Sequence, residues 1–474
     1  MLRSSLLCTV AAIVCTTFVH AQVTLTPLPG FGTGGWIAPG SSPYVTIGNT
    51  ERGLAYNPVT GNLLLVARQN VSGISNNVRI MSSTTGADIA GLDNTGVTGG
   101  TFLLNMVDVD ESGAIYAANL SGSATAVFKV YKWNDETLAV PPTVAYTALS
   151  GLARTGDSFA VTGGSMANPA KFAASGSNAV NASNFAVGTL DGVNSTFTYL
   201  SVPGTTAANN DYRLSLTFVD SDTLIGNQGT TARLTSFDPF TSTLDASIPL
   251  GGVARRPLDY AVVAGRPLLA VIDTNSSQVT VLDITNPAVP VQLAQANNTT
   301  GVLTANGNGA GSVCWGLIAG NTATLYAMST NQGIQAFQLT LPAATAVPYG
   351  TGCDGLVLGT TGVPSIGNLG FELVASNVSV VSPVAFFLIG TVVVPPPGID
   401  LGSIDMVGCA LYHNNDIGIY GQAPSISGTA TFPLPIPNDL TFLGFTVSSQ
   451  GLAFSLATGL NLVTSNAVLL TAAF

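Results

Sequence analysis

The amino-acid sequence predicts an all-β protein, on three observations. Strand-favouring residues (Val, Thr, Ile and aromatics) alternate with turn formers, and the 474 residues include 53 Gly and 26 Pro. The residues that long surface helices require are scarce, since charged side chains make up 8% of the chain and Lys occurs only at positions 129, 132 and 171. A strand-turn-strand pattern also recurs between residues 22 and 342. We therefore expect repeated antiparallel sheets.

The first residues predict export. Arg3 precedes an apolar run from Leu6 to Val14, and Val19-His20-Ala21 presents small or β-branched residues where a signal peptidase cleaves. A membrane anchor is the alternative, but so short a run without a stop-transfer flank fits a spanning helix poorly. We expect residues 1–21 to be a signal peptide and the mature protein to act in the periplasm, at the cell surface or outside the cell.

The recurring pattern is an apolar strand, a turn rich in Gly, Asp or Asn, and a second apolar strand, which is typical of a β-hairpin. Clear copies lie at residues 53–68, 105–119, 215–228 and 258–273, and weaker copies at 153–163 and 314–329. A third apolar strand follows most copies, for example at residues 127–133 and 278–284.

The spacing of these hairpins predicts a β-propeller over residues 22–342. The second strands, taken at Leu63, Ile115, Phe159, Leu224, Leu268 and Leu325, are spaced by 52, 44, 65, 44 and 57 residues. A period of about 40–50 residues with several strands per unit is typical of propeller blades, whose faces are buried only when the ring closes. Six blades fit best, and seven remain an alternative because the longest interval contains apolar segments at Lys171 and Asn184. We expect residues 22–29 to supply the outer strand of the last blade.

A different pattern begins near residue 343. Residues 343–348 are interpreted as a linker, and residues 349–474 contain apolar runs separated by Pro and Gly, which predicts a β-sandwich. Cys353 and Cys409 both lie in this part, so we expect them to pair; on the chain-entropy model, closing their loop stabilises the domain by about 4 kcal/mol. Cys314 is then left unpaired, and we expect a buried packing residue rather than a catalytic thiolate, because no histidine or cation lies near it in sequence.

The charge balance excludes some partners. A net charge of −11 disfavours nucleic acid and anionic membrane surfaces, and no membrane span is expected in the mature chain. Several cationic and aromatic residues nevertheless flank the expected inner strands: Arg52, Arg68, Arg255, Arg256, Trp36 and Trp315. If they surround one mouth of the channel, they could bind an anionic or sugar-like ligand. Alternatively, each arginine satisfies loop carbonyls or pairs with a nearby aspartate.

The first region resembles the secreted, non-WD propellers with NHL, YVTN or gluconolactonase-like blades. The resemblance rests on the turn Asp110-Glu-Ser-Gly-Ala-Ile-Tyr116 and implies an architecture that serves enzymes, metal sites and scaffolds alike. The Tyr-Gly-Thr-Gly-Cys opening at Tyr349, the second cysteine and the Pro-Leu-Pro segment at Pro433 are similar to C-terminal modules of exported planctomycete-type proteins. That resemblance implies an accessory or surface-association role.

A finer resemblance, to the gluconolactonase/regucalcin-like family, implies a divalent metal on the channel axis. The matching residues are Glu51 before the first inner strand, Asn105 eight residues before Gly113, and Asp259 in a later blade. The chain departs from the family pattern at Met106, where the family has Asp, and at Pro257-Leu-Asp-Tyr260, which replaces Pro-Asp-Gly. The family's second Asn has no counterpart, which puts the ligand set in doubt.

A second candidate metal site is Asp108-x-Asp110-x-Ser112-Gly113, which looks like the start of a Ca²⁺ loop. Its twelfth position is Asn119 rather than the usual Glu, and the alternative is a hairpin turn.

From the sequence we therefore predict an exported propeller that binds a carbohydrate, small-molecule or protein ligand, or acts as a scaffold. The alternative is a metal-dependent lactonase or esterase.

Overall fold

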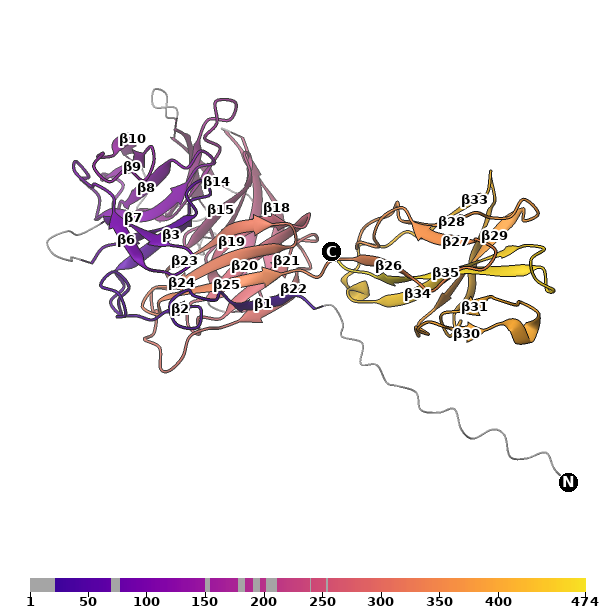
Figure 1. Ribbon diagram of the computed structural model, residues 1–474. Coiled ribbons are helices and arrows are strands. Elements are labelled where there is room, and N and C mark those ends of the chain that lie inside the picture. Colours follow the sequence, from indigo (N-terminus) through magenta and orange to yellow (C-terminus); the bar gives the residue numbers. More distant parts are fainter. Residues whose placement is uncertain are drawn as a thin grey trace. The chain divides into compact units, whose positions relative to one another are not determined.

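The computed structural model describes residues 22–69, 77–149, 154–177, 184–190, 197–201, 211–238, 240–252 and 255–474, so the predicted signal peptide lies outside the described residues. Two compact units are distinguished, Val23–Thr340 and a unit containing Leu341–Phe474. Both are built almost entirely of strands (Figure 1), so the all-β prediction is confirmed. In the described part of the chain, no helix is long and apolar enough to cross a bilayer.

In the described residues, the first unit contains six antiparallel sheets around a central channel. Five of them consist of four successive strands running outward from the channel, and the sixth has five strands, two of which come from the N-terminal segment. The first sheet consists of β3 (Glu51–Tyr56), β4 (Asn62–Ala67), β5 (Asn77–Ser82) and β6 (Asp88–Gly91). The second consists of β7 (Phe102–Val109), β8 (Ile115–Leu120), β9 (Val127–Trp133) and β10 (Thr143–Leu149). The third consists of β11 (Arg154–Thr162), β12 (Lys171–Ser177), β13 (Asn184–Thr189) and β14 (Phe197–Ser201). The fourth sheet consists of β15 (Ser215–Asp220), β16 (Thr223–Asn227), β17 (Thr231–Phe237) and β18 (Ser242–Pro249). The fifth consists of β19 (Arg255–Val263), β20 (Arg266–Asp273), β21 (Val279–Asp283) and β22 (Val291–Ala296). The sixth consists of β23 (Gly311–Ala319), β24 (Thr322–Ser329) and β25 (Ile334–Thr340) together with β1 (Thr24–Pro27) and β2 (Trp36–Ile37).

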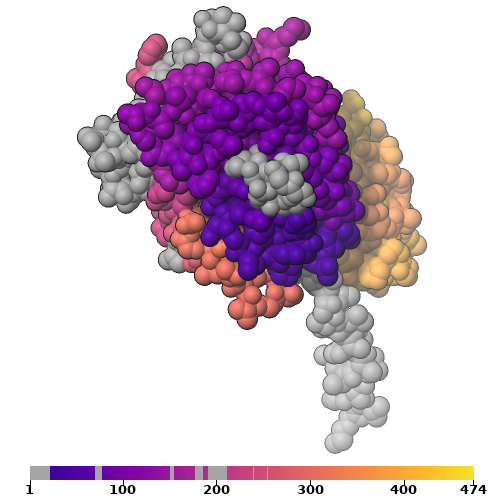
Figure 2. Space-filling view, turned by 90° about the vertical axis from the view of Figure 1, so that its left-hand side faces the viewer, coloured from indigo at the N-terminus to yellow at the C-terminus, as the bar shows by residue number. Residues whose placement is uncertain are grey.

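Residues from neighbouring sheets form the hydrophobic core of the propeller. Leu64 and Val66 of β4 pack with Ile115 and Ala117 of β8, and Phe128 of β9 packs with Phe172 of β12. Because each apolar cluster draws on two sheets, no sheet buries its faces alone. The indigo and purple surface toward the viewer in Figure 2 belongs to the N-terminal segment and the first two sheets.

The N-terminal strand closes the ring, as the sequence predicted. β1 pairs antiparallel with β25 from Thr24↔Thr340 to Pro27↔Phe337, so the outer strand of the last sheet comes from the opposite end of the unit. β2 then continues along the same edge of β25, from Trp36↔Gln335 to Ile37↔Ile334.

The weak hairpin predicted at residues 153–163 was wrong. These residues contribute to one inner strand, β11, and its partner is β12, with a register shift between Thr155 and Phe159. Gly156 has φ +96°, and a Cβ there would lie 2.2 Å from the Asn119 carbonyl oxygen, so this glycine marks a bulge in close contact with the next sheet and not a turn. The segments at Lys171 and Asn184, which suggested a seventh blade, form β12 and β13 of the same sheet.

The second unit contains a five-stranded sheet, a three-stranded sheet and a short two-stranded ribbon. The strands of the five-stranded sheet are, in spatial order, β26 (Thr345–Tyr349), β35 (Leu462–Thr471), β34 (Thr446–Phe454), β29 (Val384–Gly390) and β32 (Gly418–Pro424). The three-stranded sheet contains β27 (Val357–Thr360), β28 (Glu372–Ser376) and β33 (Thr429–Pro433). The ribbon pairs β30 (Ile399–Asp400) with β31 (Ala410–Leu411). Short 3₁₀ turns lie at Gly402–Ile404 and Leu440–Phe442. The core between the sheets contains Phe371, Leu373, Phe387 and Val468.

The linker predicted at residues 343–348 was wrong in part. Thr345–Tyr349 forms β26, which pairs with β35 at the edge of the five-stranded sheet. Pro348 lacks a backbone N–H and therefore fits such an edge strand, where not every donor is needed.

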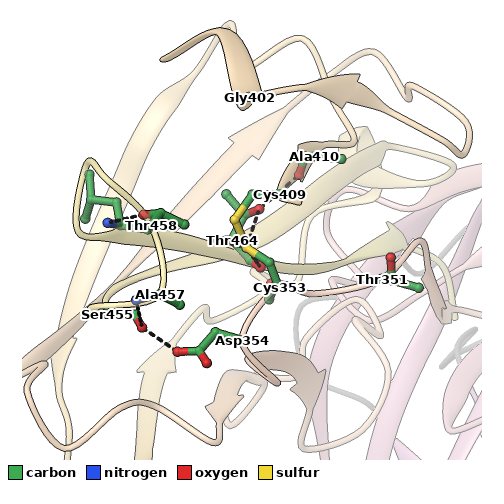
Figure 3. Close-up of a disulfide and its surroundings, with 12 residues drawn as sticks. Thr351, Cys353, Asp354, Gly402, Cys409, Ala410, Ser455, Ala457, Thr458 and Thr464 are labelled. Carbon is green, nitrogen blue, oxygen red and sulfur yellow. Dashed lines mark hydrogen bonds between the residues drawn. A yellow bond between two sulfur atoms is a disulfide. The ribbon is translucent and has the colours of Figure 1, made fainter. Parts of the chain in front are cut away.

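The predicted disulfide between Cys353 and Cys409 is present, with 5.1 Å between the Cα atoms, and Cys314 is a buried free cysteine. Figure 3 shows Thr464 of β35 beside the disulfide: its backbone N–H donates to the Cys353 Sγ at 3.2 Å, and its hydroxyl donates to the Ala410 carbonyl at 3.0 Å. The disulfide thus joins two irregular segments next to a buried strand.

Ring closure predicts different results from two truncations. Removing residues 22–29 should leave the outer edge of β25 unpaired and favour aggregation, whereas truncation after Pro342 should leave all six sheets and a cooperative unfolding transition. Light scattering and thermal denaturation of both variants provide the measurement. Aggregation of the second variant with unchanged melting of the first would contradict the closure.

The cysteine assignment predicts a thiol count. Reaction with a thiol reagent under denaturing, non-reducing conditions should find one free thiol per mature chain, because Cys314 alone remains unpaired. Under native conditions that thiol should react slowly, since burial raises its pKa and the neighbouring Asp259 and Asp108 raise it further. Three reactive thiols in the denatured chain would contradict the pairing.

Candidate anion-binding site

The inner strands β3, β7, β11, β15, β19 and β23 stand side by side around the channel, each next to the following one. All six contribute residues to a cavity of about 230 Å³ inside the channel. Because every sheet is traversed from the channel outward, the starts of the six inner strands lie at the same mouth. Side chains that are far apart in sequence therefore meet there.

Four of the inner strands have a register shift at this mouth. The shifts lie between Glu51 and Leu54, Phe102 and Met106, Thr155 and Phe159, and Arg255 and Leu258. Bulges of this kind re-aim side chains and are common beside functional sites. Here the bulged segments hold Arg52, Asn105, Asp157 and Arg256.

Asp157 holds two arginines at the mouth. Its carboxylate accepts from Arg154 Nε at 2.5 Å and Nη2 at 2.7 Å, and from Arg213 Nε at 2.7 Å. The Asp157 side chain is 10% exposed, whereas those of Arg154 and Arg213 are 36% and 31% exposed. One buried carboxylate therefore orients two guanidinium groups that still face solvent.

Arg52 and Arg68 lie beside this pair. Arg52 Nη1 donates to the Glu51 carbonyl at 3.0 Å and to Thr330 Oγ1 at 3.3 Å. Arg68 Nη2 donates to the Asn49 carbonyl at 2.8 Å, and its guanidinium lies 3.8 Å from the centre of the Phe102 ring. The Arg68 Nε is buried without a hydrogen-bond partner. We call Arg52, Arg68, Arg154 and Arg213 the arginine cluster.

Positive charge in the arginine cluster is not fully balanced. The pKa of Arg68 is lowered to about 9, chiefly by burial and in addition by repulsion from Arg52 and Arg154, while Glu51 and Asp157 act in the opposite direction. Burial also lowers the pKa of Arg52, against the attraction of Asp157 and Glu51. Four cations therefore share two carboxylates, in a protein whose net charge is −11. A ligand anion would relieve the repulsion between the guanidinium groups.

The other predicted residues are not part of the arginine cluster. Arg255 Nη1 donates to the Leu250 carbonyl, and Arg256 packs against Gly309 with its Nε buried and unpaired. Trp315 is buried, and its indole N–H donates to the Asp259 carbonyl at 3.2 Å. Trp315 is therefore a packing residue and not part of the mouth.

Asp108 and Asp259 line the cavity deeper in the channel. Asp108 Oδ2 accepts from the Val161 N–H at 2.6 Å, and Asp259 Oδ2 accepts from the Trp315 N–H at 2.9 Å, so each carboxylate bridges to the next inner strand. Both side chains keep some surface on the channel, but the surrounding strands withdraw them from bulk solvent. Burial therefore raises the pKa of Asp108 to about 7 and that of Asp259 to about 6, against the opposing effect of the hydrogen bonds.

Glu51, Asn105 and Asp259 do not share a cavity. Glu51 Oε1 accepts from the Thr46 N–H at 2.5 Å, Asn105 Nδ2 donates to the Gly156 carbonyl at 2.7 Å, and Asp259 lines the channel cavity, which neither of the other two reaches. Among the described residues, no group of three or more His, Cys, Asp or Glu is placed to hold a metal ion. Each of the three side chains thus forms a hydrogen bond within the protein.

The candidate Ca²⁺ loop is folded as a hairpin turn. Asp110 Oδ1 accepts from the Ser112 N–H at 2.9 Å and the Ala114 N–H at 3.0 Å, and its Oδ2 accepts from the Tyr116 hydroxyl at 3.1 Å. Asp108 is directed into the channel instead. The acidic side chains are therefore not arranged around a common point.

The chain is similar to one family model and to several solved structures. Residues 44–252 match the family described as a domain of unknown function (DUF4623). A DUF4623 family protein from Bacteroides eggerthii DSM 20697 is similar at 17% identity and TM-score 0.47, over 62% of this chain and 71% of that one. A gluconolactonase from Xanthomonas campestris is similar at 12% identity and TM-score 0.39, over 68% and 90%. No curated protein matches the sequence. At these TM-scores, neither similarity says anything of a ligand.

Sequence reasoning missed Arg154, Asp157 and Arg213. A signal was present, because Arg154 begins an inner strand and Arg213 lies two residues before one, much as Arg52 and Arg255 lie at the start of theirs. It was hidden because the strand containing Arg154 was interpreted as a hairpin. Residues at the start of each inner strand should therefore be compared as one set in proteins of this architecture.

The raised pKa values predict a pH dependence of stability. Because Asp108 and Asp259 bind protons more tightly in the folded than in the unfolded state, their contribution to the free energy of unfolding falls as the pH rises from about 4 to about 7. The variant with Asp108→Asn and Asp259→Asn should lose this slope relative to the parent. Urea denaturation between about pH 5 and pH 8 measures it.

The matched control is Asp93→Asn. The Asp93 carboxylate is exposed and its pKa is lowered by hydrogen bonds to Thr95, so it is ionised throughout that range. An equal change of slope in the control and the double variant would contradict the assignment.

Proposed function

We propose that the protein is an exported binding module whose propeller holds an anionic ligand at the arginine cluster. The observation that carries this proposal is the convergence of Arg52, Arg68, Arg154 and Arg213 around two carboxylates at one mouth of the channel. The chain has only 13 lysines and arginines. Placing four arginines close together costs electrostatic free energy unless an anion binds between them.

The chemistry of the cluster favours a ligand with carboxylate, sulfate or phosphate groups. Guanidinium groups offer planar pairs of N–H donors that match the oxygens of such anions. Arg154 and Arg213 are held in place by Asp157 and still expose part of their surface, so less conformational entropy is lost on binding. The buried, unpaired Nε of Arg68 is a further donor that a ligand oxygen could satisfy.

No specific observation favours the metal-dependent hydrolase, since Glu51 and Asn105 are engaged away from the cavity that Asp259 lines. The C-terminal sandwich adds no cation, because all lysines and arginines lie at or before Arg266. We assign it an accessory role beside the binding propeller.

The proposal predicts salt-sensitive binding of multivalent anions. Isothermal titration of the mature protein with citrate, inorganic phosphate and oligogalacturonate should detect at least one ligand, with affinity that falls as NaCl is raised. Arg154→Ala should weaken that binding about ten- to a hundredfold, because one partly exposed guanidinium is lost from the cluster while Arg213 still neutralises Asp157.

Lys129→Ala is the matched control, since it removes the same charge from β9, where Lys129 Nζ donates to Thr98 Oγ1. It should leave the affinity unchanged. The proposal is wrong if none of the three anions binds, or if both substitutions weaken binding equally.

A further inference from the structure

A second candidate site lies on the outer part of the propeller. A groove of about 820 Å³ runs between the segment that closes the ring and the first sheet. Its walls come from residues 32–43, from the β5–β6 turn at residues 85–88, and from Asn298 and Thr300 after β22. We infer that this groove binds a neutral carbohydrate.

Trp36 supplies an aromatic wall with a fixed position. Its indole N–H donates to the Gln332 carbonyl at 2.9 Å, and its backbone is held in β2 opposite Gln335. Ile37 and Pro43 lie along the same groove. An anchored indole beside small apolar groups offers the flat, rigid surface on which the C–H face of a pyranose ring can stack.

The remaining wall is rich in uncharged hydrogen-bonding groups. Thr33, Ser41, Ser42 and Thr300 contribute hydroxyls, which both donate and accept. The Asn298 amide N–H₂ donates to the Gly35 carbonyl at 3.2 Å and to the Ala336 carbonyl at 3.0 Å, which fixes the amide and leaves its oxygen as an acceptor. Hydroxyls and a fixed amide oxygen match the hydroxyl groups of a sugar.

The groove presents no free charge. Asp88 is its charged lining residue, and both of its oxygens accept from Arg79, at 2.8 and 2.5 Å. The Arg79 side chain is 9% exposed and lies 4.0 Å from the centre of the Tyr44 ring, so this pair is part of the structure of the wall. A neutral ligand therefore fits this groove, in contrast to the arginine cluster.

An extended peptide fits less well. A peptide that adds to a sheet needs an edge with unpaired backbone groups. The edge of β25 next to the groove is already paired with β1 and with β2. Recognition must therefore come from the side chains of the groove, which favours a polyol over a polypeptide backbone.

The test is isothermal titration of the mature protein with cellohexaose, mannohexaose and xylohexaose. At least one should bind and change the tryptophan fluorescence, because Trp36 lines the groove whereas Trp133 and Trp315 are buried. Trp36→Ala should weaken binding about tenfold or more, and Trp36→Tyr should retain most of it. Thr300→Trp, placed on an exposed residue of the wall, should abolish binding without disturbing the core.

Two controls separate this site from the arginine cluster. Arg154→Ala should leave hexasaccharide binding unchanged, so the failure of one site is distinguishable from that of the other. A neutral Ser- and Thr-rich peptide should not bind. The inference is overturned if no hexasaccharide binds, if the peptide binds instead, or if hexasaccharide binding persists in Thr300→Trp. The Thr300→Trp result tests the inference even if the Trp36→Ala variant does not fold.

Discussion

The pairing of β1 with β25 is the constraint on which the propeller depends. Each sheet leaves two apolar faces, and those faces are buried only against the neighbouring sheets, as in the cluster that joins Phe31 and Ile37 to Leu63 and Leu65. The pairing of Thr24–Pro27 with the last sheet joins the two ends of the unit, so that the ring has no free strand edge at this point. Closure also fixes the starts of the inner strands around one mouth, which is where the arginine cluster forms.

The architecture followed from local patterns in the sequence. Strand pairs such as β7 and β8 are short and joined by clear turn residues, so their period could be predicted from the sequence. The sheet with Phe159 was misread because Gly156 and Asp157 look like a turn, whereas the glycine forms a bulge against Asn119. Residues 345–348 were misread because a short segment that ends in proline can be either a linker or an edge strand, and its composition does not distinguish the two.

The candidate site was harder to predict, because it is assembled across the ring. Arg52, Arg154 and Arg213 lie in or just before the inner strands of three different sheets, and only the common direction of these strands brings them together. Asp259, which a family resemblance singled out as a metal ligand, illustrates the difficulty: its carboxylate accepts from the Trp315 N–H and the Thr217 hydroxyl and so links neighbouring strands. Residue type alone could not distinguish a metal ligand from a carboxylate that hydrogen-bonds to neighbouring strands.

The two candidate sites differ in charge, and this difference has a physical origin. In the groove, the Arg79–Asp88 pair is internally neutral, so hydroxyls and Trp36 determine what can bind. At the mouth, burial and mutual repulsion lower the pKa of Arg68 to about 9, although Glu51 and Asp157 partly offset the repulsion. The structure therefore combines one cationic site with one neutral site on the same propeller.

The central claim is that the arginine cluster is an anion site, and a crystal soaked in selenate tests it most directly. Anomalous scattering should locate a selenate within hydrogen-bonding reach of Arg154 and at least one of Arg52, Arg68 and Arg213. Selenate bound at other arginines, such as Arg233 or Arg266, while the mouth of the channel remains empty, would contradict the account.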